Sequence, residues 1–339
     1  MDNITHTLAG IALSQAGLNR TTRFATLALI IGSNLPDIDV AWASWGRGAG
    51  YLQYHRGVTH SFLGVAALGA LLGGTIYLIG RRAKPAPKSP PLNLRWLLLL
   101  GWLSVGVHLL MDFTNAYGVR PLLPFSGRHY AWDIMPIVDP VLLVLLAAGL
   151  GLPILFRLVS EEVGARKPGF KRGAIFALAG MAAWWGFRDL SHRRLLGFLD
   201  SHTYGQEAPL RTGAFPGFGP LDWTGVVETD SAFHVLAANP LDSDVDTDHT
   251  EVFYKPKPSA ALDAALRTRT GRVFSDFARF LWAHVEENPD GFDVTLRDLR
   301  FASVRESRHA FECHIELGKD LSVRSESFGF VGRPVDRGN

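Results

Sequence analysis

The chain has 339 residues, of which 47% are hydrophobic and 19% charged, and its formal net charge is +2. This composition excludes a disordered chain, and the length is sufficient for two domains. Only nine of the 32 acidic residues lie in residues 1–190, so the two parts of the chain are expected to lie in different solvents. The single cysteine, Cys313, leaves no partner for a disulfide within these residues and argues against a cysteine-based zinc site.

The first part contains long apolar runs of the kind that form membrane-spanning helices. Five such runs lie at about 24–42, 62–80, 95–115, 134–157 and 173–188. A shorter apolar segment at 4–18 would reach only about 22 Å as a helix, less than the ~30 Å hydrocarbon core, so we expect it to begin partway through the bilayer. The sequence therefore predicts an α-helical polytopic membrane domain of about six segments in residues 1–198.

Basic residues are concentrated in alternate connections between these segments. Connections 19–23, 81–95 and 157–172 are rich in Lys and Arg, which makes them cytoplasmic by the positive-inside rule. Connections 43–60 and 116–133 carry fewer basic residues and are expected to face outward. The chain after the last segment should then face outward too, although Arg188, Arg193 and Arg194 near that segment argue for the opposite orientation.

Residues 199–339 are predicted to form a water-soluble α+β domain outside the cytoplasm. The expected elements are extended segments near 222–238 and 249–255, a helix near 259–287, and alternating runs at 292–301, 309–317 and 321–331. The pattern of this domain does not indicate a function.

The acidic and histidine residues of the membrane part gather at one predicted depth. Before residue 157 the acids are Asp2, Asp37, Asp39, Asp112, Asp133 and Asp139, and the histidines are His6, His55, His60, His108 and His129. The predicted topology places all of them towards the outer side. Ionisable groups at membrane depth are costly unless they are paired, metal-bound or in a wet cavity, so this gathering indicates a functional site.

The chemistry of these residues suits a divalent transition metal. His108 lies about 20 Å from the inner face, and Asp112 follows one turn later on the same side of the helix, so one helix can supply two ligands. Imidazole and carboxylate ligands without a thiolate suit zinc, with manganese or iron as alternatives. The candidate ligands are His6, Asp37, His60, His108 and Asp112, with His129 and Asp133 as a second tier. This number of ligands fits one or two ions, which would activate water for displacement at phosphorus or carbon.

Candidate catalytic residues lie beside these ligands. Arg56 offers a fork of donors suited to a phosphate or a carboxylate, and Thr59 or Ser61 can cap the following helix. Asp39 is a candidate proton acceptor. Together with His55, Asp39 and Arg56 form the predicted catalytic set.

Each motif also has a simpler structural explanation. Residues 34–39 could be only a helix stop followed by a turn, and residues 54–61 only an interfacial loop. His6 could be a polar cap near a helix start, and His108 with Asp112 could be a hydrogen-bonded pair that stabilises helix packing. The convergence of all of them at one depth favours the metal site.

Several motifs in residues 1–190 resemble those of the YdjM-type family of inner-membrane metal-dependent hydrolases. The matching strings are Asp2…Thr5-His6…Gly10, Leu35-Pro36-Asp37-Ile38-Asp39, His55-Arg56-Gly57-Val58-Thr59-His60-Ser61, His108…Asp112 and Gly118…Leu123-Pro124-Phe125-Ser126. The His-Arg-Gly-x-Thr-His-Ser string is the most specific of these. The resemblance implies a multi-pass protein of a bacterial or archaeal inner membrane with hydrolase activity.

The order of these residues is also similar, more weakly, to that of the zinc-dependent phospholipase C and single-strand nuclease group. That similarity implies one metal on Asp37, His60, His108 and Asp112, and another on His6 and a bridging Asp112. The group closes its site with a further His and a His-x-x-x-Glu motif, for which His129-x-x-x-Asp133 is the nearest match here.

These observations lead to one principal hypothesis of function. The chain is expected to be a membrane-embedded metal-dependent hydrolase that acts on a phosphoester or related bond of an amphiphilic, lipid-like substrate at the outer leaflet. Arg56 would hold the anionic group. No basic face suits a nucleic acid. The alternatives are a membrane transporter or ion-handling protein with a cavity lined by His and Asp, or a scaffold without catalysis that displays the second domain.

Overall fold

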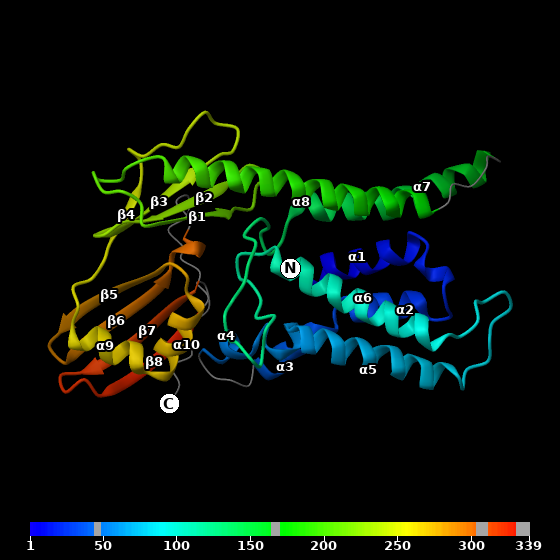
Figure 1. The fold of residues 1–339 in the computed structure, drawn as a ribbon, viewed down its shortest axis with the longest axis horizontal. Helices are drawn as coiled ribbons and strands as arrows, with labels where there is room; N and C mark the ends of the chain where they lie inside the picture. Colours follow the sequence, from blue (N-terminus) through cyan, green and yellow to red (C-terminus); the bar gives the residue numbers. More distant parts are fainter. Residues whose placement is uncertain (44–48, 164–169, 303–310, 330–339) are drawn as a thin grey trace. The chain divides into compact units, whose positions relative to one another are not determined.

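The computed structural model describes residues 1–43, 49–163, 170–302 and 311–329 (Figure 1). The chain divides into two compact units, which are treated separately below. The first unit comprises Met1–Asp39 and Arg56–Asp189, and the second comprises Val40–His55 and Leu190–Asn339. Parts of the predicted connections 43–60 and 157–172, namely residues 44–48 and 164–169, lie outside the described residues.

The first unit is helical. Its α-helices are α1 (Asn3–Gln15), α2 (Ala25–Gly32), α5 (Phe62–Gly80), α6 (Leu94–Phe113), α7 (Pro140–Val163) and α8 (Phe170–Asp200), the last of which continues into the second unit. Short 3-10 helices connect them: η1 (Leu18–Arg20), η2 (Leu35–Asp39) and η3 (Val58–His60). In Figure 1, α1, α2, α5 and α6 lie together, and α2 packs against α1, α5 and α6.

Three helices among the described residues are long and apolar enough to cross a membrane: Phe62–Gly80, Leu94–Phe113 and Pro140–Arg157. They coincide with three of the predicted segments. The run 24–42, predicted as one segment, is instead interrupted, because α2 ends at Gly32 and the chain turns into η2. Pro36 disfavours helical backbone at the residue before it and has no amide hydrogen with which to continue a helix. The prediction of six spans is thus supported for three, while the run 173–188 lies within the longer helix α8.

Helices α5 and α6 approach each other very closely through glycines. A Cβ atom at Gly101 would overlap the carbonyl oxygen of Gly69, and one at Gly69 would overlap Trp102. The indole nitrogen of Trp102 donates to the carbonyl of Ala66 at 3.0 Å across the same contact. Small residues at a helix interface allow this kind of backbone approach in membranes. The contact fixes α6, which carries two of the predicted ligands, against α5.

The second unit contains two four-stranded antiparallel sheets and short helices. Its helices are α3 (Val40–Ala43), α4 (Gly50–Tyr54), α9 (Ala260–Arg267) and α10 (Arg269–Phe277). The first sheet has the order β1 (Arg211–Pro216), β2 (Trp223–Glu228), β3 (Ala232–Ala238) and β4 (Glu251–Tyr254). The second has the order β5 (Leu281–Asn288), β6 (Gly291–Asp298), β7 (Glu312–Gly318) and β8 (Val323–Gly329).

One sequence prediction for this unit was wrong, and one strand was missed. The helix expected near 259–287 is divided at Thr268, whose backbone is extended and whose hydroxyl caps α10 by accepting from the amide of Gly271 at 3.0 Å. Its last part is instead strand β5, which pairs with β6 from Leu281↔Asp298 to Asn288↔Gly291, so only two residues form the turn. Strand β1 was not predicted. Residues 309–310 and 330–331, which belong to predicted strand runs, lie outside the described residues.

Candidate metal centre

Helix α6 supplies two of the candidate ligands. His108 and Asp112 are one turn apart on the buried side of this helix, and both are fully buried. Ser104, one turn before His108, is also fully buried and donates to the carbonyl of Leu100 at 2.8 Å. The imidazole and the carboxylate therefore face the interior of the first unit and not the surface.

Asp37 and His60 come from short 3-10 helices next to longer helices: η2 follows α2, and η3 precedes α5. The side-chain amide of Asn34 donates to the carbonyl of Ile30 and to the hydroxyl of Thr7, both at 3.0 Å, which fixes the exit of the chain from α2. Asp37 follows in η2. On the other side, the hydroxyl of Ser61 caps α5 by accepting from the amide of Gly64 at 3.0 Å, and this holds His60 at the end of η3.

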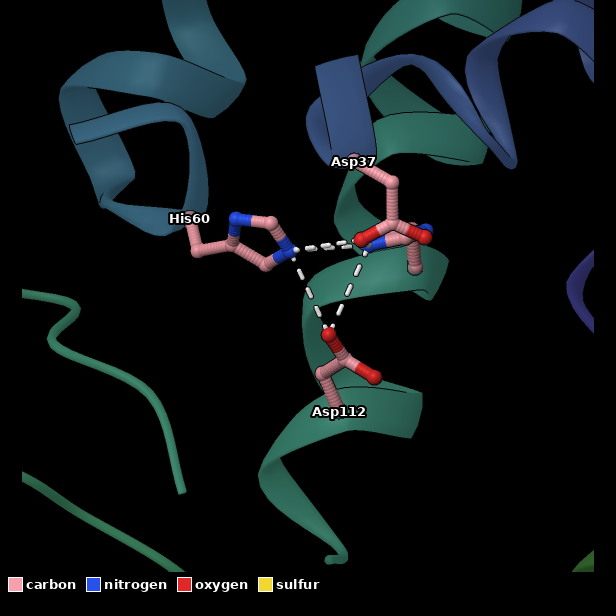
Figure 2. A group of neighbouring side chains, drawn as sticks. Asp37, His60 and Asp112 are labelled. Carbon is pink, nitrogen blue, oxygen red and sulfur yellow. Dashed lines mark hydrogen bonds and ion pairs between the residues drawn. The ribbon is translucent and has the colours of Figure 1, made fainter. Parts of the chain in front are cut away.

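Asp37, His60, His108 and Asp112 form one group, called the His/Asp group below. One ligand atom from each lies within 4.8 Å of the others. The Nε2 atom of His60 lies 3.4 Å from Asp37 Oδ1, 3.3 Å from Asp112 Oδ2 and 3.0 Å from His108 Nε2 (Figure 2). The Nε2 atom of His108 lies 3.6 Å from each of the same two carboxylate oxygens. Residues from three segments of the chain thus direct ligand atoms at one point.

Both imidazoles of the group are oriented by a partner on their other ring nitrogen. His108 Nδ1 lies 2.8 Å from the carbonyl oxygen of Ser33, and because a carbonyl only accepts, Nδ1 is the donor and the ring is held with Nε2 towards the group. His60 Nδ1 lies 3.2 Å from Asp39 Oδ2 and 3.0 Å from Thr59 Oγ1. Metal-binding histidines in proteins are commonly oriented by such a carbonyl or carboxylate.

His6 provides an independent test of whether the site suits a cation. Its ring is fully buried and stacks on His108, with 3.9 Å between the ring centroids. Its Nε2 atom lies 3.3 Å from Asp112 Oδ1, yet neither ring nitrogen makes a hydrogen bond of normal geometry within the described residues. A buried polar atom without a partner is costly, and a bound cation would satisfy it. The donor set, imidazole and carboxylate without thiolate, fits a divalent transition metal.

Arg56 lies beside the group and contacts Asp112 Oδ1, the carboxylate oxygen that does not face His60 and His108. Its Nη2 atom donates to Asp112 Oδ1 at 2.9 Å, its Nη1 atom donates to the carbonyl of Gly118 at 3.3 Å, and its guanidinium lies over the ring of Tyr117. The α-amino group of Met1 also contacts Asp112 Oδ1. The backbone amide of Arg56 donates to Asp39 Oδ2 at 2.9 Å. Arg56 therefore connects Asp39, which orients His60, with Asp112, which belongs to the group.

The carboxylates dominate the electrostatics around His60. Burial by itself would lower the pKa of this imidazole, but hydrogen bonds with Asp112, Asp37 and Asp39 outweigh it and raise the pKa to about 10. Burial would raise the pKa of Asp37, but hydrogen bonds from His108 and His60 hold it below its usual range. The carboxylates of Asp37, Asp39 and Asp112 therefore favour a positive charge at the position of His60.

The family model of the YdjM inner membrane protein matches residues 1–195, which include the whole His/Asp group and His6. The chain belongs to this family. The "Uncharacterized protein YfhP" of Bacillus subtilis (strain 168) is 25% identical over 350 residues, which cover 98% of this chain and 95% of that protein. No solved structure matches the chain. The match to the YdjM family confirms the resemblance found in the sequence, and with the apolar helices it makes the chain a membrane protein.

The remaining predicted residues of this YdjM-family chain lie outside the His/Asp group. His55 belongs to the second unit, where it follows α4 and its ring lies 4.7 Å from that of Tyr51. His129 and Asp133 lie in the loop after α6, and neither belongs to the group. The roles of Ser33 and Gly118 were not predicted, because they act through backbone carbonyls. Of the two residues predicted to be able to cap α5, Ser61 caps it, and Thr59 donates to Asp39 Oδ2 at 2.7 Å.

Proposed function

We propose that the protein is a membrane-embedded metal-dependent hydrolase that cleaves a phosphoester or related bond of an amphiphilic substrate. The observation that carries the proposal is the convergence of two buried imidazoles and two carboxylates at one end of apolar helices. A structural ion pair would not need four ligand atoms within 4.8 Å of one another. It would also not need an additional imidazole, His6, with neither nitrogen hydrogen-bonded within the described residues.

The His/Asp group would hold one ion, with zinc as the first choice and manganese or iron as alternatives. A metal bound there would supply Lewis-acid chemistry and activate water. His6 and Asp112 are the residues that would hold the second ion implied by the similarity to the phospholipase C group. The residues of the chain orient the ligands and bind the substrate.

The contacts of Asp39 and Arg56 suggest their parts in this function. Asp39 Oδ2 accepts from Thr59 and from the backbone of Arg56 and faces His60, so we assign Asp39 to the orientation of His60 and not to proton acceptance. Arg56 places a positive charge beside Asp112, and its Nε atom has no hydrogen-bond partner within the described residues. That donor suits an anionic group of the substrate. His55, next to Arg56 in the chain, is the candidate proton acceptor.

The position of the site along the helices favours an amphiphilic substrate. His60 lies two residues before the first residue of α5, and Asp112 is the last residue but one of α6. The group therefore lies where two candidate spans end, the level at which lipid head groups meet the hydrocarbon core. A head group could reach the metal while its tails stay among the exposed apolar side chains of α5. We place this end of the helices at the outer leaflet, from the distribution of basic residues.

Metal analysis of the purified full-length protein tests the site directly. We expect the wild-type chain to bind a stoichiometric transition metal and the variants His108→Ala and Asp112→Asn to lose it, because each removes a ligand from a buried site. His249→Ala is a matched control, since this histidine is exposed in the second unit. Unchanged metal content in both site variants, measured by mass spectrometry of the folded proteins, would refute the metal centre.

Activity assays then separate hydrolysis from transport. With a chromogenic phosphodiester and with phospholipids in mixed micelles, we expect turnover that is lost with a chelator and restored by the metal. Metal flux into proteoliposomes without turnover would instead support the ion-handling alternative. A protein that binds metal but shows neither activity would contradict both.

A further inference from the structure

The loop after α6 forms an ordered hairpin with an apolar tip. Val119 and Tyr130 exchange backbone hydrogen bonds at 2.9 and 2.8 Å, and the amides of Ile134 and Met135 both donate to the carbonyl of Thr114 at 3.0 Å. These bonds hold the base of the hairpin against the end of α6. The tip, residues 121–126, has the sequence Pro-Leu-Leu-Pro-Phe-Ser and was singled out in the sequence only as part of a family motif.

The tip lies at the level where two candidate spans end. The amide of Phe62, the first residue of α5, donates to the carbonyl of Pro121 at 2.9 Å. The other end of the hairpin continues directly from Phe113, the last residue of α6. Both attachments therefore lie at the ends of α5 and α6, and the tip belongs to the first unit.

The side chains at this level are apolar and exposed. Phe125 is 86% exposed and Leu122 is 40% exposed. The first turn of α5, to which the tip is hydrogen-bonded, exposes Phe62 by 62% and Leu63 by 49%. A group of large apolar side chains on a protein surface indicates contact with another apolar phase.

We propose that residues 121–126 insert into the membrane interface, with Phe125 as the anchor. Lipid is the expected occupant because the exposed apolar side chains continue along α5, a candidate span that also exposes Leu71, Leu78 and Ile79. Beyond the tip, the guanidinium of Arg128 lies 5.5 Å from the ring centroid of Tyr130, and Arg128 is exposed. An aromatic ring beside a basic group is typical of the head-group region.

The hairpin also connects this anchor with the metal centre. Gly118, at its base, accepts from Arg56 Nη1, and Arg56 in turn donates to Asp112. Insertion of the tip would fix the depth of the His/Asp group relative to the lipid head groups. The inference concerns the membrane contact and does not require the protein to be an enzyme.

Spin labels on single cysteines test this insertion in the full-length protein. The native Cys313 can stay in place, because it is fully buried and burial raises the pKa of its thiol to about 12; the unmodified protein serves to confirm that it does not label. Labels would be placed at Phe125→Cys and Leu122→Cys. Leu71→Cys, on the exposed side of α5, is the control for lipid, and Ala86→Cys, in the exposed connection after α5, is the control for water.

The measurement is the collision of each label with oxygen and with a water-soluble nickel chelate, in nanodiscs of phosphatidylcholine and phosphatidylglycerol. We expect positions 125 and 122 to resemble position 71, with several-fold more oxygen access relative to nickel than at position 86. Nickel access equal to that at position 86 would place the tip in water and refute the proposal. Protection from both reagents would indicate contact with protein and would refute it equally. Because Phe125 is so exposed, its substitution should leave folding intact.

Discussion

The two histidines of the His/Asp group differ in how they are oriented, and this difference can be tested. His108 is held by the carbonyl of Ser33, which a side-chain substitution cannot remove. His60 is held by Asp39, whose Oδ2 atom also accepts from Thr59 and from the backbone of Arg56. Asp39 is therefore the residue through which the orientation of an imidazole can be altered without loss of a ligand.

We expect Asp39→Asn to weaken metal binding by about 10- to 100-fold, the usual effect of losing an outer partner of a metal ligand. The amide keeps the shape of the carboxylate but lacks the charge that favours the proton on His60 Nδ1. The number of ions bound at saturating metal should not change. A competition titration against a chelator of known affinity measures this loss.

Asp139→Asn is the matched control for that substitution. Asp139 is also buried, but its Oδ1 atom accepts from the amide of Leu142 at 2.7 Å at the start of α7. Asparagine caps helices about as well as aspartate, so this variant should bind metal like the wild type. An equal loss in both variants would show a general effect on the fold, and no loss in Asp39→Asn would contradict its role beside His60.

At the residue scale the sequence was sufficient to predict that the four side chains of the His/Asp group lie together, but not which residues contact them. The i, i+4 spacing of His108 and Asp112, together with the helix ends near Asp37 and His60, predicted that these four side chains share one depth. The bond of Thr59 to Asp39 and that of Arg56 to Asp112 depend on how two short 3-10 turns are placed against α6. No local pattern in the sequence encodes such a placement.

At the scale of elements, the close approach of α5 and α6 determines whether the ligands of α6 reach the group. Gly101 and Gly69 face each other, and Gly73 lies equally close to the backbone of Leu97 and Leu98. Because backbone lies on both sides of these contacts, an added methyl group could be accommodated only by separating the helices. The same helix also contains Gly106, around which there is open space.

Gly101→Ala should therefore destabilise the first unit, by about 1–3 kcal/mol as is typical of overpacking. It should also lower metal affinity, since α6 would move relative to η2 and η3. Thermal unfolding in detergent and metal content measure the two effects. Gly106→Ala is the control for the change in helix propensity, and it should lower neither the stability of the first unit nor its metal affinity. If both variants behaved alike, the close contact of α5 and α6 would have no energetic importance.

Elements were predictable where one physical signal dominated. The helices of α5, α6 and α7 follow from apolar runs as long as the bilayer is thick. The run 24–42 is also largely apolar but is divided, because the break at Asn34 and Pro36 provides the turn that carries Asp37. Similarly, residues 281–287 were assigned to a helix, although their partner strand β6 lies just beyond a two-residue turn. Pairing with another strand, which a window on the sequence does not detect, determined that element.

At the scale of the whole molecule, the side of the membrane on which the second unit lies depends on α8. This helix has 31 residues, but within the described chain it is not among the three helices that meet the length and hydropathy expected of a span. Arg188 lowers its hydropathy, yet this side chain is fully buried and its Nε atom donates to the carbonyl of Ile134 at 2.9 Å. A buried and hydrogen-bonded arginine is compatible with membrane depth, and it is not an exposed charge of a cytoplasmic loop.

We therefore expect α8 to cross the membrane, which would place the connection 81–95 and the second unit on opposite sides. Single cysteines at Ala86 and at Asp248, an exposed position between β3 and β4, distinguish the arrangements when intact cells are treated with a membrane-impermeant thiol reagent.

Cys313 is buried and should stay unlabelled. Labelling at 248, with labelling at 86 only after permeabilisation, is the expected result, because the short connection 81–95 is rich in Lys and Arg, whereas a long domain is translocated largely regardless of its charge. Protection of both positions would show that α8 does not cross, since α6 and α7 alone would return the chain to the cytoplasmic side. Labelling at 86 alone would invert the topology and move the metal centre to the inner leaflet.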